Sequence, residues 1–543
     1  MVFARRSTTL LAAIIASCAM VLSLTACTSD NKTVVDGQTT VTSNSAGGVA
    51  VFTPSDGITL NQQTPLNKWA KLVPDLAKAL ADAGFKKGDI DHTTSDSLAK
   101  QSRAIQDFVV DHLSNNTTDD SGIAIAPDNM TLLVAPVVEA DASTRQYGDY
   151  VSQNLSTNDA TDGEATSDGE SSKDDSSKDD SSNTESDSTA SDEQAQAVDR
   201  LVSSLKLAKE SGMHVVLLGN SIEGYKPDAF VKFSDAQTIG KLQAEKMVSK
   251  LKLDKASKDN PKYIEVLLPY TAVDEKGNAN DSAFAQEAFR GIWQVLGSYY
   301  QKGVVESPSG TLDGKSTEND WQAVAYDAAK EGSTAKVLDK RLAKTDGQST
   351  LTRIDGIITM NDYIASEVVK ELDDLGYTGS AADINPQITI SGIVGNITGK
   401  KDLSRDAVPD PIKSPENDNA NDSSSSDDDA DEDTSASDKD RDSQWPLVTG
   451  YGAYVSNIPS IVNGKQWMTG MEDRQTIATD IAQACAKLNK DEALNSMPSI
   501  RNSEVGGVKK IPTISEPLLA VSASNLKSAL IDPGYISLAD AGL

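Results

Sequence analysis

The sequence predicts an α/β fold built from parallel sheets with helices on both faces. Apolar runs of strand length alternate with stretches of helical periodicity along most of the chain. Helices that connect successive strands favour parallel pairing, and parallel sheets are covered on both faces. With 543 residues and 38% hydrophobic content, the chain can form two or three domains with large cores.

The first part of the chain is expected to alternate in this way up to residue 210. Trp69, Leu72 and Leu76 recur at helical spacing, and Gly84 follows the end of that pattern. The expected elements, in chain order, are a strand at 49–52, helices at 65–83 and 97–113, a strand at 123–126, and a helix at 130–139 that continues at 198–210.

The alternation continues through the second part of the chain. The expected elements are strands at 214–218 and 230–233, a helix at 236–251, a strand at 263–268, a helix at 282–299, a strand at 356–359, a helix at 364–375 and a strand ending at 448. Ligands of parallel sheets bind beyond the carboxyl ends of the strands. The loops expected to carry binding residues therefore follow Leu60, Ala126, Leu218, Leu268, Thr359 and Val448.

The negative charge is concentrated in two Ser/Asp-rich stretches. The formal net charge is −31, and much of it lies at about 157–195 and about 400–444. These stretches have almost no large apolar side chains to offset the entropy of ordering, so we predict disordered insertions. A calcium site is the alternative, although neither stretch has EF-hand spacing. The charge argues against nucleic acid as a partner.

The N-terminus has the features of an export signal. Arg5 and Arg6 precede an apolar run at 10–22, which is short for a membrane span. Leu-Thr-Ala-Cys at 24–27 then resembles the bacterial lipoprotein signal. This predicts a signal peptide at 1–26, an acylated Cys27, and a tether at 27–48. The protein would be anchored by lipid to the extracytoplasmic face of the cell membrane. An ordinary secretory signal with an incidental Cys27 is the alternative.

Catalytic and metal-binding motifs are missing from the sequence. The three histidines (His92, His112 and His214) have no metal-ligand spacing. The phosphate-loop pattern fails at Lys401, where Ser or Thr is required, and there is no Gly-x-Ser-x-Gly. We therefore expect no enzyme activity, cofactor or metal, with an unrecognised glycosidase or other hydrolase as the alternative.

Cys485 is the one cysteine outside the export signal and Cys27, and its helical spacing predicts a buried side chain.

Five segments, in order, resemble motifs of type I periplasmic sugar-binding proteins, in the xylose and multiple-sugar branch. Ile354–Asp362 is similar to the "D-A-V-V-A-x-N-D" strand and loop, and Val448–Thr469 to "V-T-G-Q-D-A … I-x-x-G-x-Q-x-M-T". Ile239–Ala244 resembles "V-G-x-L-Q-A". Gly57–Trp69 resembles the first strand and its "R-W" helix, and the tail at 511–535 also fits that branch.

The resemblance implies two α/β lobes that close on a sugar, with three hinge crossings between them. It places the N-terminal lobe at 49–235 and the C-terminal lobe at 236–467. Residues 468–505 would return to the N-terminal lobe, and 506–543 would form a hinge and C-terminal tail. By analogy with the family, the protein would deliver its solute to the membrane permease of an ABC-type importer.

Seven residues are implied as ligand contacts by their positions in these motifs. They are Lys68, Trp69, Asn220, Asp235, Asn361, Asp362 and Tyr451. Each has a simpler alternative: Trp69 in the core, Lys68 in solvent, or Asn361 and Asp362 at a helix start. Tyr451 and Gly452 stand where the family has Gln-Asp, and no arginine follows Asn220. A sensory or structural surface protein that keeps the fold but has lost sugar binding is therefore the alternative function.

Overall fold

The computed structural model describes ten ranges of the chain: residues 46–55, 65–115, 125–138, 145–150, 153–156, 185–270, 282–328, 330–343, 351–381 and 443–543. Cys27, the signal peptide and residues 157–184 and 400–442 of the acidic stretches lie outside these ranges, as does Leu60. Within the described ranges, no helix has the length and apolarity to cross a bilayer.

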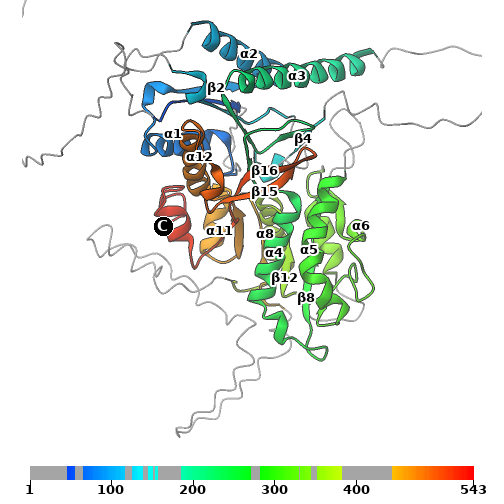
Figure 1. Ribbon diagram of the computed structural model, residues 1–543. Helices are drawn as coiled ribbons and strands as arrows, with labels where there is room; N and C mark the ends of the chain where they lie inside the picture. The colour runs from blue at the N-terminus through cyan, green and yellow to red at the C-terminus, as the bar shows by residue number, and fades with distance from the viewer. Residues whose placement is uncertain are drawn as a thin grey trace, which may run out of the picture. The chain divides into compact units, whose positions relative to one another are not determined.

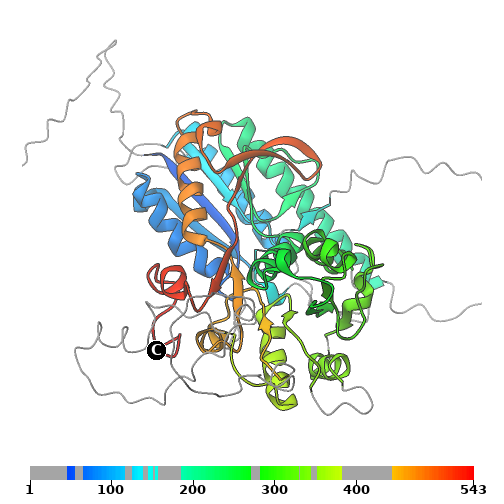
Figure 2. The ribbon, with the colours of Figure 1, turned by 90° about the horizontal axis from the view of Figure 1, so that it is seen from below.

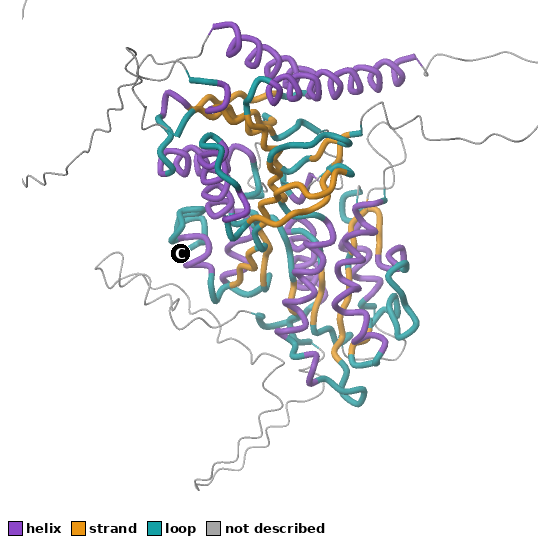
Figure 3. Tube along the Cα trace, viewed as in Figure 1, coloured by secondary structure: helices purple, strands orange, loops and turns teal. Residues whose placement is uncertain are grey.

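The first lobe is built on a seven-stranded sheet (Figures 1 and 3). Its strands, in chain order, are β1 (Gly48–Pro54), β2 (Ile90–Ser95), β3 (Met130–Val134), β5 (His214–Leu218), β7 (Ala229–Lys232), β15 (Ile500–Val505) and β16 (Val508–Ser515). They lie in the order β15-β16-β7-β5-β3-β1-β2. All neighbours are parallel except β15 and β16, which form an antiparallel hairpin.

Helices cover both faces of this sheet (Figure 2) because side chains along each strand alternate between the two faces. Val49 and Val51 lie in one core with α1 (Trp69–Asp82) and α12 (Arg474–Leu488). The intervening Ala50 and Phe52 lie in a second core. This second core is formed with α2 (Leu98–Asn115) and α3 (Glu185–Glu210), which pack side by side (Figure 1).

The second lobe repeats the arrangement on a smaller scale. Its sheet has the order β10-β8-β12-β13 and is parallel throughout. The strands are β8 (Lys262–Val266), β10 (Val305–Glu306), β12 (Gly356–Ile358) and β13 (Leu447–Val448). The helices α4 (Ala236–Lys250) and α5 (Ala283–Gln301) share one core with β8, and α7 (Ser333–Arg341) and α8 (Asp362–Leu375) share another with β12 and β13.

Both sheets place the first strand between the second and the third, which is the order of doubly wound folds. The chain leaves the first lobe after β7, returns to it between β13 and α12, and leaves it again after β16. The smaller described elements are α6 (Trp321–Val324), α11 (Ile458–Val462), and the strand pairs β4 (Asn154–Leu155) with β6 (Ser221–Ile222), β9 (Leu268–Tyr270) with β11 (Ala325–Asp327), and β14 (Met468–Met471) with β17 (Leu519–Ser522). The predicted α/β class, with parallel sheets flanked by helices and three crossings, is confirmed.

Several local predictions were wrong. Residues 130–134 form β3 rather than the start of a helix, because all five are buried on both faces of the sheet and all but Thr131 are apolar. Residues 125 and 126 precede a short 3-10 turn and are not in a strand. Helix α3 begins at residue 185, inside the interval predicted to be disordered. β16 lies in the first sheet, although the sequence assigned 506–543 to a hinge and tail.

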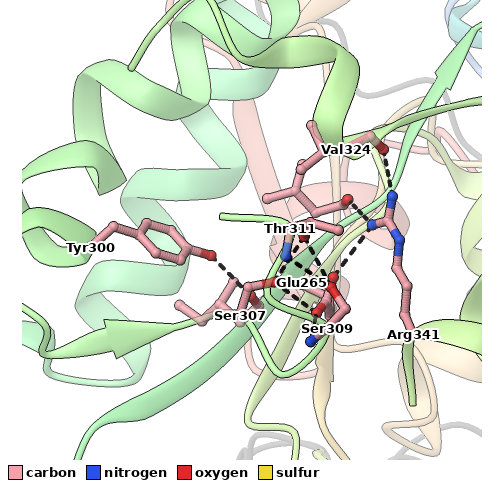
Figure 4. A network of polar contacts seen from close by, with 9 residues as sticks. Glu265, Tyr300, Ser307, Ser309, Thr311, Val324 and Arg341 are labelled. Atoms are coloured by element: carbon pink, nitrogen blue, oxygen red, sulfur yellow. Dashed lines mark hydrogen bonds and ion pairs between the residues drawn. The ribbon is translucent and has the colours of Figure 1, made fainter. Parts of the chain in front are cut away.

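The second lobe contains a fully buried carboxylate, Glu265, on β8 (Figure 4). Its Oε1 accepts hydrogen bonds from the Ser307 hydroxyl (2.7 Å) and the Ser309 backbone N–H (2.9 Å). The Arg341 guanidinium lies 3.3 Å from its other oxygen and also donates to the Val324 carbonyl. A buried ion pair of this kind contributes little net stability, but either partner alone would be strongly destabilising. The network therefore fixes the loop after β10 and the end of α7 against β8.

Helices α4 and α5 meet at two glycines. A β-carbon at Gly291 would lie 2.0 Å from the Gln237 carbonyl oxygen, and one at Gly240 would lie 2.2 Å from the Ala288 carbonyl oxygen. These obstacles are backbone atoms, so they cannot move aside as a flexible side chain can. The contact therefore sets the spacing between the two helices.

Gly291→Ala is expected to lower the free energy of unfolding by about 1–3 kcal/mol, because the added methyl overpacks this contact. In an open helix the same change would stabilise by about 1 kcal/mol. Urea unfolding of the purified protein measures the difference. Ser298→Ala, at an exposed position of α5, is the control. A stabilised Gly291→Ala protein would contradict the close approach.

Candidate functional site

The strand order of the two sheets predicts where a ligand site would be. In a doubly wound sheet the crevice opens at the carboxyl end, between the first strand and the third. In the first lobe this point lies between β1 and β3, and in the second lobe between β8 and β12. The segments after β3 and β12 contain residues 145–150 and Asn361, and a hydrogen bond between Gln146 and Asn361 joins them.

Residues 146–150, which we call the bridging segment, bind the first lobe through Asp149 and Tyr150. The Asp149 carboxylate accepts from Lys68 Nζ (2.8 Å) and from the Trp69 backbone N–H (3.1 Å), and its own N–H donates to the Asn67 carbonyl (2.8 Å). The Tyr150 hydroxyl donates to the Lys68 carbonyl. Lys68 occupies the N-cap position of α1, but its side chain makes no capping hydrogen bond. The bridging segment therefore binds the start of α1 in place of a side-chain cap.

Aromatic packing supports the same contact. The Tyr150 ring stacks on Phe233 with centroids 4.7 Å apart, and Trp69 meets both rings edge-on at 5.0 and 5.7 Å. Trp69 and Tyr150 are almost completely buried, at 2% and 1% exposed. Phe233 directly follows β7, at the first crossing between the lobes. Aromatic pairs of this geometry stabilise beyond their buried area by about 0.5–1.5 kcal/mol each.

The other end of the bridging segment binds the second lobe. The Asn361 side-chain amide donates to Gln146 Oε1 (3.1 Å), and the Tyr454 hydroxyl donates to the Gln146 carbonyl (2.7 Å). The Tyr147 ring lies 4.7 Å from Phe284 on α5 and 6.3 Å from Tyr451. Tyr147 belongs to the core of the second lobe, whereas Tyr150 belongs to a core of the first. Five consecutive residues therefore contact both lobes.

A second polar group lies where the first and second crossings meet. The Ser234 hydroxyl, after β7, hydrogen-bonds the hydroxyl of Tyr451, and the Ser234 backbone N–H donates to Glu472 Oε1 (2.6 Å). The Tyr451 hydroxyl also lies 3.4 Å from Glu472 Oε1. Burial raises the pKa of Glu472 to about 7, although these hydrogen bonds oppose the shift. Burial and Glu472 hold the pKa of Tyr451 well above its usual range.

Asp362 is a structural centre of the second lobe. Its carboxylate is fully buried and accepts from Gln466 Nε2 (2.7 Å), the Thr469 hydroxyl (2.8 Å) and the Tyr454 N–H (2.9 Å). Burial raises the pKa of this carboxyl to about 6, and the three donors limit the shift. Both oxygens thus have protein donors, and Asp362 holds the segment after β13 against the start of α8.

The remaining implied contacts also have protein partners. Asp235 caps α4 by accepting from the Thr238 N–H (2.7 Å), and it pairs with Lys232 (2.9 Å). Burial alone would raise the pKa of the Asp235 carboxyl, but these contacts together lower it. Asn220 accepts from the Gln153 N–H (3.0 Å) and donates to the Pro136 carbonyl (2.9 Å). Asn361 caps α8 through the Ile364 N–H (2.9 Å).

The structure brings five of the seven implied contacts to the bridging segment or to Gln153. Lys68, Trp69, Asn361 and Tyr451 contact the bridging segment, and Asn220 contacts Gln153. Asp235 and Asp362 lie apart from it. The side-chain NH2 of Asn67 is buried and has no acceptor among the described residues. None of the described His, Cys, Asp and Glu side chains form a group suited to a metal ion.

Sequence reasoning did not identify Asn67, the bridging segment or Glu472. None of the five segments that resemble the family motifs covers residues 135–156, so the resemblance gave no signal for the bridging segment. The Gln-Tyr-Gly-Asp-Tyr run at 146–150 does carry one: polar and aromatic residues cluster around a glycine in a stretch otherwise rich in Ser, Thr and Asp. Such composition is typical of a loop that packs its own side chains.

No protein-family model matches the chain, and no curated protein matches it significantly. Solved structures similar to it include an ABC transporter solute-binding protein from Clostridium phytofermentans with bound β-D-glucose (17% identity, 91% of this chain and 99% of that chain, TM-score 0.44). A carbohydrate transporter solute-binding protein from Chloroflexus aurantiacus with D-glucose has 17% identity, 92% and 98% coverage, and a TM-score of 0.43. A periplasmic ribose ABC transporter protein from Conexibacter woesei has 13% identity, 90% and 96% coverage, and a TM-score of 0.42.

These structures are of the class that the sequence motifs resemble. Identities and TM-scores this low assign no ligand to this chain. Its two-lobe architecture follows instead from the strand order of its own sheets and the contacts between its own residues. Two parallel sheets of the same doubly wound order, joined by three crossings, form the two-lobe architecture that the resemblance implies.

Glu472 is expected to make stability depend on pH. Its pKa of about 7 in the folded protein exceeds the ordinary value of 4.5 for a glutamate, so between these pH values the folded protein holds a proton that the unfolded chain has lost. Stability therefore falls as pH rises through this window, by at most about 3 kcal/mol. Glu472→Gln should remove this loss of stability and leave only the smaller loss that the raised pKa of Asp362 causes. Melting temperatures from pH 5 to 8 measure it, with exposed Glu492→Gln as control. Parallel pH profiles for wild type and Glu472→Gln would contradict the buried site.

Proposed function

We propose that the protein is an extracytoplasmic solute-binding lipoprotein that binds a sugar between its two lobes and presents it to an ABC-type importer. One observation carries the proposal: polar and aromatic side chains of both lobes contact residues 146–150 or Gln153. Lys68, Trp69 and Asn220 come from the first lobe, and Asn361 and Tyr451 from the second. Side chains of this kind bind sugars by hydrogen-bonding hydroxyls and stacking on ring faces.

The buried NH2 group of Asn67 supports a ligand in this region. A buried donor without an acceptor costs about 1–3 kcal/mol. A sugar hydroxyl between the lobes would supply the acceptor and recover that energy. Neighbouring residues Lys68 and Trp69 already belong to the implied contacts, so Asn67 extends the same group of residues.

Sugar binding is tested by thermal shift and calorimetry on the mature protein with pentoses, hexoses, short oligosaccharides and non-sugar solutes. A ligand of the folded state raises the melting temperature by mass action. Asn67→Ser should then weaken the bound sugar about tenfold, which is the loss expected for one buried hydrogen bond. Asn260→Ser, at an exposed position of the second lobe, should leave affinity unchanged. Absence of any stabilising sugar would refute sugar binding.

The lipid anchor rests on the sequence at 24–27 and has its own test. Cys27→Ser should move the protein from the membrane fraction to the soluble fraction, because the acylated thiol is lost. Fractionation of cells expressing each form, followed by immunoblotting, measures the change. Cys485→Ser is the control, since that thiol is buried in α12. Unchanged membrane retention of Cys27→Ser would leave the ordinary secretory signal as the better interpretation.

A second function is favoured by a specific observation. All seven implied contact residues have hydrogen-bond, ion-pair or ring partners within the protein. A sensory or structural surface protein that keeps the two-lobe fold without binding sugar would need such pairing permanently. The two functions differ in the titration above, because only the first predicts a sugar that stabilises the folded state.

A further inference from the structure

We propose that the bridging segment, residues 146–150, is a built-in occupant of the interlobe site that holds the two lobes together without a ligand and competes with a ligand for the same side chains. The inference rests on the proposed function for the identity of the competitor. The closing role itself stands on contacts within this chain and does not require a sugar.

The first argument is the coincidence of partners. The resemblance implied Lys68, Trp69, Asn361 and Tyr451 as ligand contacts, without reference to residues 146–150. The structure pairs these four with the bridging segment: Asp149 binds Lys68 and Trp69, Gln146 binds Asn361, and Tyr147 packs near Tyr451. A ligand that used these groups would have to displace the segment from them.

The second argument is the kind of contact. Sugars are bound by charge-assisted and amide hydrogen bonds with aromatic rings stacked on their faces. The bridging segment offers the same set from its own chain: a carboxylate at Asp149, an amide at Gln146, and rings at Tyr147 and Tyr150. Lys68 and Asp149 have side chains only 14% and 20% exposed, so their ion pair is largely withdrawn from water.

The third argument is mechanical. The segment contacts the first lobe at Lys68 and the second lobe at Asn361, and only Tyr147 and Gly148 separate Gln146 from Asp149. Four residues span at most about 14 Å, so these contacts hold the lobes close while both are formed. Release at either end leaves the lobes joined by the three crossings and by the contact of the Leu66 N–H with the Gly452 carbonyl (2.9 Å).

Gly148 makes this arrangement testable without altering any contacting side chain. Its φ is +100°, and a β-carbon there would lie 2.6 Å from the Asn67 carbonyl oxygen and 2.7 Å from the Asn67 β-carbon. Alanine fits neither the backbone conformation nor the space. Gly148→Ala should therefore displace the segment from the first lobe. Gly310→Ala is the matched control, because Gly310 has φ +70° but open space around it.

The experiment measures hydrogen–deuterium exchange of the full mature protein in the absence of sugar. In Gly148→Ala, peptides covering 66–72 in the first lobe and 451–457 in the second should exchange about tenfold faster or more. Peptides covering β5 should be unchanged, which separates lobe release from general unfolding. Gly310→Ala should match wild type at 66–72 and 451–457. Unchanged exchange in Gly148→Ala, or faster exchange in the first lobe alone, would overturn the closing role.

A second variant covers the case in which Gly148→Ala fails to fold. Asp149→Asn keeps the shape of the segment and removes the ion pair with Lys68. It should raise exchange at 66–72 and 451–457 in the same direction by a smaller factor. Identical exchange to wild type in this variant would overturn the role of the Asp149 contact in closing the lobes.

Titration with D-glucose, D-xylose and L-arabinose tests the competition. A sugar that binds wild type should bind Gly148→Ala about tenfold more tightly, because the competent state is no longer suppressed by the segment. Weaker binding to the variant would overturn competition and make the segment part of the sugar site. If exchange rises in both lobes but none of the sugars binds either protein, the closing role is supported and the proposed sugar binding fails.

Discussion

The two lobes are separate α/β bodies, and the polar groups at their crossings must find partners once water is excluded. An unpaired buried donor or acceptor costs about 1–3 kcal/mol, which is a large share of the stability of an ordinary domain. Ser234, Tyr451 and Glu472 meet this requirement by bonding to one another across the first two crossings. Asp362 meets it with three donors from the segment after β13 and from β14. The junction between the lobes is therefore fixed by polar pairing as well as by apolar burial.

Periodicity in the sequence was enough to predict the long, regular elements. Helices α1, α2, α4, α5 and α8 and strands β1, β5 and β12 lie close to their predicted ranges, because each has an uninterrupted apolar pattern. Short or fully buried strands were missed for physical reasons. β3 is apolar at every position except Thr131, and a buried helix segment can show the same pattern. β2 is mostly exposed and gave no apolar signal at all.

The candidate site was predictable in part. The motif resemblance identified residues near the ends of parallel strands, and Lys68, Trp69, Asn361 and Tyr451 among them contact the bridging segment. It could not reveal their partners, since pairing between residues 68 and 149 or 146 and 361 depends on tertiary structure. Trp69 illustrates the limit: a helix-face tryptophan reads as core from its spacing, yet its backbone and ring both meet the bridging segment. Capping by Asn361 and Asp235 was open from sequence and is present in the structure.

Because the bridging segment competes with a ligand for the same side chains, the apparent affinity for that ligand depends on how readily the segment is released. A tethered competitor acts at an effective concentration of the order of millimolar, set by the length of its linkage. A ligand must therefore offer the side chains at the crossings more than the bridging segment offers them, and its apparent affinity falls by the fraction of molecules in which the segment is released. The Tyr150 and Tyr147 rings make this competition selective, because a ligand without a face to replace them would leave apolar surface in water. The residues of the bridging segment that hold the lobes together therefore also determine which kind of ligand could separate them.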